Sequence, residues 1–148
     1  MNNIIKKAFE NGRLIIFLGA GASFSSKTQN GTPIPLASEL SRLISQEIGL
    51  PYSDESLSEV YQAANEILGF QRLIEILSIY LKNTRPSDEY KVLVNLPLTR
   101  IYSLNIDDSI ERSFYFTNQN NSKRTLEVFR NNDPLKETDQ FFHRVDLI

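Results

Sequence analysis

The chain has 148 residues, of which 41% are hydrophobic and 23% are charged, and its formal net charge is −2 at pH 7. This composition is that of a globular domain, and it argues against a nucleic-acid-binding protein, which would carry a basic patch. The absence of cysteine excludes disulfides and cysteine-ligated zinc within these residues and fits a reducing cytoplasm. No apolar run is long enough for a secretory signal or a membrane span, so we expect a cytoplasmic protein without membrane association.

The first elements predicted are a short helix and a core strand. Ile4, Ile5 and Phe9 share one helical face, and Gly12 follows as a C-cap. The five apolar residues Leu14–Leu18 predict a strand that is buried on both faces, as in a parallel sheet.

The strand leads directly into Gly19-Ala20-Gly21-Ala22-Ser23. A strand, a glycine turn and the start of a helix direct backbone N–H groups toward a phosphate, which predicts a nucleotide pocket. The alternative is a tight turn after a core strand, because Phe24 stands where the dinucleotide fingerprint requires a third small residue.

Helical segments follow over about 36–48, 57–68, 70–81 and 86–96. Ser56 and Glu59 have the spacing of a capping box at the start of the second of these helices. We interpret the apolar stripes of the helices as core contacts, and we expect a helical insertion over about 36–96.

Three further strands are predicted, over 100–104, about 125–130 and about 145–148. The first ends at Asn105-Ile106-Asp107-Asp108, and a helix follows that Asp107 or Asp108 can cap. Strands separated by helical segments predict an α/β fold with a Rossmann-like parallel sheet. Since a mean sheet has five or six strands, we expect residues 1–148 to be one domain and the N-terminal portion of a longer protein, inactive on its own.

Two strand ends therefore carry residues capable of chemistry, Gly19–Ser23 and Asn105–Asp108. Ligands of open α/β sheets bind beyond the carboxyl ends of the strands, so we expect the two segments to meet. Asn105 could bind a sugar hydroxyl or hold a water, or it could only cap the following helix.

These motifs, with Gly31-Thr32-Pro33 between them, resemble the NAD-binding core of the sirtuins. The stretch from Tyr102 to Glu111 is most similar to the bacterial sirtuin-like NADases of anti-phage defence. The resemblance implies that Gly19, Ala20, Gly21 and Ser23 line the pyrophosphate and adjoining ribose, with Pro33 in a cofactor-binding loop. It also implies that Asn105 orients the water or the ribose at the reacting carbon and that Asp107 supports the pocket.

The implied reaction is cleavage of NAD to nicotinamide and ADP-ribose, without a metal. Deacetylating sirtuins carry a catalytic histidine followed by glycine shortly after this asparagine, but here Arg124 stands near that place. The general base is then either His143, the single histidine of the chain, or a histidine beyond Ile148.

The sequence is compatible with three functions. The first is an NAD hydrolase that acts as a defence effector, working as a homo-oligomer or with a partner sensor subunit or domain. The second is a module that binds NAD or ADP-ribose without turnover. The third is an NAD-dependent protein deacylase.

Overall fold

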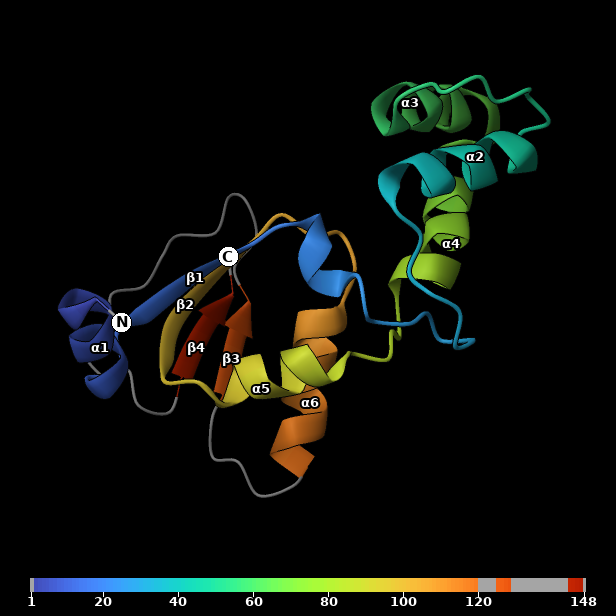
Figure 1. The fold of residues 1–148 in the computed structure, drawn as a ribbon. Coiled ribbons are helices and arrows are strands. Elements are labelled where there is room, and N and C mark those ends of the chain that lie inside the picture. The colour runs from blue at the N-terminus through green and yellow to red at the C-terminus, as the bar shows by residue number, and fades with distance from the viewer. Residues whose placement is uncertain (1, 120–124, 129–143, 148) are drawn as a thin grey trace.

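The computed structural model describes residues 2–119, 125–128 and 144–147. Its centre is a four-stranded sheet in the order β1-β2-β4-β3, in which all neighbouring strands are parallel (Figure 1). The strands are β1 (Leu14–Leu18), β2 (Leu98–Ser103), β3 (Thr125–Val128) and β4 (Arg144–Leu147). The predicted α/β class with a Rossmann-like parallel sheet is confirmed.

Six α-helices accompany the sheet in the described residues: α1 (Asn3–Glu10), α2 (Ala37–Glu47), α3 (Leu57–Leu68), α4 (Phe70–Leu81), α5 (Asp88–Asn95) and α6 (Ser109–Gln119). Helices α5 and α6 lie against the sheet, whereas α2, α3 and α4 form a separate group to one side (Figure 1). No helix within the described ranges is long and apolar enough to cross a membrane.

The sheet and the helices α5 and α6 share one hydrophobic core. Its buried residues are Tyr90, Val94, Leu98, Ile101, Ile110 and Phe114. From β1, Leu14, Ile16 and Leu18 pack against this core and are partly buried. The core thus fixes β1 and β2 side by side, so their carboxyl ends lie together.

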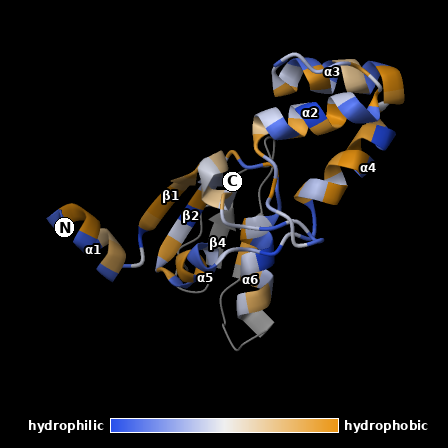
Figure 2. Ribbon diagram, turned by 45° about the vertical axis from the view of Figure 1, so that its right-hand side comes forward, coloured by the Kyte–Doolittle hydropathy of each residue, from blue (hydrophilic) through white to orange (hydrophobic). Residues whose placement is uncertain are grey.

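The opposite face of β1 corrects the sequence-based expectation of a strand that is buried on both faces. Ile15 and Phe17 are 49% and 76% exposed, and the Phe17 ring stacks on Tyr102 of β2 at a centroid distance of 4.8 Å. The physical reason is that the core helices cover only the other face of the strand. Figure 2 colours β1 as hydrophobic because both of its faces carry apolar residues, although only one of these faces packs against the core.

The helices α2, α3 and α4 have a hydrophobic core of their own, made by Leu40, Ile44, Val60, Ala64, Leu73 and Leu81. The predicted capping box of Ser56 and Glu59 starts α3, and α4 has the predicted bounds. Within the predicted insertion of about 36–96, these three helices pack together, whereas α5 contributes Tyr90 and Val94 to the core of the sheet.

Candidate functional site

The segment after β1 differs in local structure from the sequence-based expectation. Ala20–Ser23 forms a short 3₁₀ helix rather than the start of an α-helix. The backbone N–H groups of Ala22 and Phe24 donate to the carbonyls of Gly19 and Gly21, at 2.9 and 3.2 Å. These two N–H groups are therefore used within the turn and are not available to a phosphate.

The two glycines of this turn leave open space above the backbone. Gly19 has an ordinary extended conformation, with φ −106° and ψ 177°, and a Cβ built on either Gly19 or Gly21 would meet no heavy atom of the described residues within 4 Å. Neither packing nor, at Gly19, the backbone angle requires glycine here. A backbone that is bare on this side permits close approach of a ligand.

The segment after β2 meets this turn through hydrogen bonds between side chains. Ser23 Oγ donates to Asp107 Oδ2 at 2.8 Å and lies 2.9 Å from the Tyr90 hydroxyl. Asn105 Nδ2 donates to Ser23 Oγ at 3.1 Å and to the Tyr90 hydroxyl at 3.2 Å. The predicted meeting of the two strand ends is thus a direct contact between Ser23, Asn105 and Asp107.

The nitrogen of the Asn105 amide makes hydrogen bonds, whereas its oxygen makes none within the described residues. Its nitrogen makes both of the bonds above, whereas its Oδ1 is buried and has no hydrogen-bond partner among the described residues. A buried acceptor without a partner costs roughly 1–3 kcal/mol. Such an atom is therefore a natural contact for the hydroxyl or water proton of a ligand.

Asp107 holds the site together rather than offering an unused carboxylate. Its Oδ2 accepts from Ser23, as above, and its Oδ1 accepts from the backbone N–H of Ser109 at 2.9 Å. Of the two candidates for the cap of α6, Asp107 therefore makes the bond to the first turn. Asp108 instead binds Asn83 and Thr84, which follow α4.

A cavity of about 220 Å³ lies at this junction. Ala20, Ser23, Asn105 and Asp107 line it together. Its remaining walls are mostly apolar and come largely from the helical group and the segments beside it: Phe24, Ile34, Pro35, Leu36, Ala37, Leu40, Leu57, Leu81, Leu104 and Ile106. Polar groups at the strand ends thus face an apolar wall.

Not every predicted site residue lines this cavity. Gly19 and Gly21 flank Ala20 without being among the lining residues, and Pro33 is exposed, whereas the neighbouring Ile34 and Pro35 line it. Pro33 pairs with Lys27 in an isolated antiparallel bridge. His143 lies outside the described residues.

Sequence reasoning missed Tyr90, which comes from α5 and is only 3% exposed. Burial is the main cause that raises the pKa of the Tyr90 hydroxyl above its usual value, so this group keeps its proton at neutral pH. No local signal separates Tyr90 from an ordinary core aromatic, because its ring does pack in the core of the sheet.

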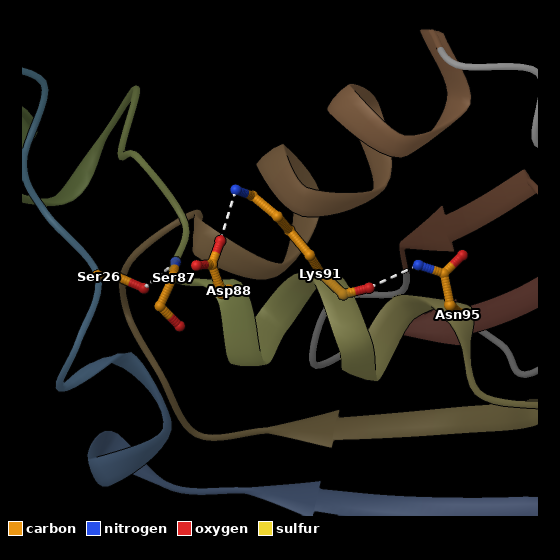
Figure 3. A network of polar contacts seen from close by, with 5 residues as sticks. All are labelled: Ser26, Ser87, Asp88, Lys91 and Asn95. Carbon is orange, nitrogen blue, oxygen red and sulfur yellow. Dashed lines mark hydrogen bonds and ion pairs between the residues drawn. The ribbon is translucent and has the colours of Figure 1, made fainter.

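Helix α5 is anchored at its start to the segment that follows the glycine turn. The Ser87 N–H donates to Ser26 Oγ at 3.1 Å, and Lys27 and Arg85 exchange backbone hydrogen bonds of 3.0 and 2.8 Å. Figure 3 shows Ser26 and Ser87 in contact at this end of the helix, with Asp88, Lys91 and Asn95 along its outer side. This anchor places Tyr90 beside Ser23.

The architecture is that of Rossmann-like proteins, in which a parallel sheet presents a ligand site at the carboxyl ends of neighbouring strands. No protein-family model matches the sequence. The chain is similar to the NAD(+) hydrolase ThsA of Acinetobacter baumannii (strain 532279), with 34% identity over 112 residues. The matched segment is 74% of this chain and 22% of that protein. This similarity confirms the resemblance to bacterial sirtuin-like NADases that the motifs predict.

Proposed function

We propose that the protein hydrolyses NAD to nicotinamide and ADP-ribose. The observation that carries this proposal is Asn105, which lines the same cavity as Ala20 of the glycine turn and whose buried Oδ1 has no hydrogen-bond partner among the described residues. The name of the similar protein from Acinetobacter, an NAD(+) hydrolase, supports the same substrate.

In this reaction the bond between the ribose C1′ and the nicotinamide nitrogen breaks, and its electron pair leaves with nicotinamide. A water oxygen bonds to C1′ and the water gives up a proton. Asn105 Oδ1 accepts a hydrogen bond from that water or from a ribose hydroxyl, so its role is placement and electrostatic stabilisation. His143, or a histidine beyond Ile148, is the proposed base that takes the proton.

The size of the cavity indicates which part of NAD it takes. At about 220 Å³ it is smaller than the roughly 300–1,000 Å³ of pockets for drug-sized ligands, so it accommodates only one portion of a dinucleotide. Its apolar walls suit the nicotinamide ring and its polar end suits the attached ribose. The pyrophosphate then runs over the bare backbone of Gly19 and Gly21, with Pro33 in the proposed cofactor-binding loop.

The experiment is to incubate the complete protein with NAD and to follow nicotinamide release, in the wild type and in Asn105→Ala. We expect Asn105→Ala to lower the rate by roughly 100-fold or more, the scale on which loss of a preorganised polar group reduces turnover. Asn65→Ala on the exposed side of α3 is the matched control and should keep the wild-type rate. Full activity of Asn105→Ala would contradict the proposal.

A second candidate is a module that binds NAD or ADP-ribose without turnover. It is favoured by one observation: both carboxylate oxygens of Asp107, the acidic residue that lines the cavity, already accept hydrogen bonds. Calorimetric NAD binding without nicotinamide release would support this candidate. Nicotinamide release that depends on an added acetylated peptide would instead support a deacylase.

The biological role proposed with this activity comes from the resemblance to the bacterial sirtuin-like NADases. NAD depletion by a cytoplasmic effector in anti-phage defence is the setting that it implies. A homo-oligomer or a partner sensor would then control the activity.

A further inference from the structure

A buried tyrosine of α5 contacts two of the three polar residues that meet at the cavity, Ser23 and Asn105. We propose that Tyr90 is a positioning residue that, both directly and through Ser23, fixes the Asn105 amide with its carbonyl oxygen toward the reacting ribose. This inference rests on the proposed NAD hydrolysis, and it assigns a role to a side chain outside the motifs.

The direction of each hydrogen bond follows from the chemistry of the partners. An ionised carboxylate only accepts, so Ser23 gives its single proton to Asp107 at 2.8 Å. Ser23 Oγ then has only lone pairs to offer. It therefore accepts from the Tyr90 hydroxyl at 2.9 Å and from Asn105 Nδ2 at 3.1 Å.

The Tyr90 hydroxyl completes the network. Because it donates to Ser23, it is available as an acceptor and receives Asn105 Nδ2 at 3.2 Å. Both contacts thus require the nitrogen of the Asn105 amide to face Ser23 and Tyr90. The carbonyl oxygen is left at the other end of the group, where it is buried without a partner among the described residues.

The reversed orientation of the Asn105 amide, with Oδ1 toward Ser23 and Tyr90, is disfavoured by the same hydrogen bonds. If Oδ1 faced inward, it would lie beside Ser23 Oγ, whose proton is already given to Asp107, and two acceptors would oppose each other. Tyr90 could satisfy only one of these oxygens with its one proton. The carboxylate of Asp107 thus makes Ser23 an acceptor, and the Tyr90 hydroxyl is a second acceptor for the same amide nitrogen.

Tyr90 is suited to this role by its rigidity and its protonation. The side chain is 3% exposed, and α5 is fixed at its start by the bond from the Ser87 N–H to Ser26 (Figure 3). Burial also raises the pKa of the hydroxyl, so it stays a proton donor across the neutral range.

The test combines a spectroscopic and a kinetic measurement on the complete protein. The protein is labelled with ¹⁵N-asparagine, and the side-chain NH₂ signals of Asn105 are assigned by their loss in Asn105→Ala. In Tyr90→Phe, which keeps the ring, we expect these signals to move toward those of the exposed Asn65. We expect kcat to fall roughly tenfold, the equivalent of one hydrogen bond, while KM changes less than twofold.

Two further variants sharpen the result. Tyr80→Phe removes a hydroxyl from a tyrosine that packs against the core of the helical group, and it should leave both measurements unchanged. Ser23→Ala leaves Tyr90 free to donate to Asn105, which favours the reversed amide. It should therefore displace the Asn105 signals more than Tyr90→Phe does.

The outcomes separate this inference from the proposed function. Unchanged Asn105 signals in both Tyr90→Phe and Ser23→Ala would overturn the positioning role, whatever the activity. Displaced signals in a protein that releases no nicotinamide would retain the positioning of the amide and overturn the proposed reaction. Displaced signals with wild-type kcat in Tyr90→Phe would overturn the role of Tyr90 in that reaction.

Discussion

Asp107 and Asp108 are neighbours in the chain, yet their carboxylates hold different parts of the molecule. Asp107 binds Ser23 and the first turn of α6. Asp108 accepts from the backbone N–H groups of Asn83 and Thr84 and from the Thr84 hydroxyl, at 2.8, 3.0 and 2.8 Å. One residue thus builds the polar site, and the next ties the end of α4 to the sheet.

We predict that Asp108→Ala lowers the free energy of unfolding by about 2 kcal/mol, because it removes the charge-assisted hydrogen bonds of Thr84, which is fully buried. Chemical denaturation measures the change. Asp88→Ala is the control, since the ion pair of Asp88 within the described residues is with exposed Lys91, and this substitution should have a far smaller effect. Equal effects of the two substitutions would refute the structural role of Asp108.

Among the helices, α3 has the clearest start signal in the sequence. Ser56 Oγ accepts from the Glu59 N–H at 3.3 Å, and Glu59 Oε2 accepts from the Ser56 N–H at 2.9 Å. Ser56→Ala should lower the free energy of unfolding by about 1 kcal/mol, as loss of an N-cap does. Ser58→Ala, within the same helix, is the comparison and should change stability less. An unchanged denaturation midpoint in Ser56→Ala would contradict the contribution of the cap.

What the sequence predicts well is local. The bounds of α4, the cap of α3 and the alternation of strands with helices along the chain follow from periodicity and from capping residues over a few positions. The exposure of Ile15 and Phe17 does not follow, because an apolar run carries no record of which helices cover each face. The role of Tyr90 is equally hidden, since it depends on contacts with residues distant in the chain.

At the scale of the molecule, the described residues form two hydrophobic cores, one around the sheet and one among α2, α3 and α4. The cavity lies between the ends of the strands and the helical group. Ser23, Asn105 and Asp107 come from the ends of the strands, whereas Leu40, Leu57 and Leu81 come from the helical group. A ligand in this cavity would contact both parts, so its binding should stabilise their junction.

In the proposed function, the glycine turn and Asn105 meet around one ligand. Its most direct test is a titration of the complete protein with a hydrolysis-resistant NAD analogue, followed by the backbone amide signals of Ala20, Ser23 and Asn105. The signals of both segments should shift together and saturate with one dissociation constant. Shifts at only one of the two segments, or at neither, would contradict it.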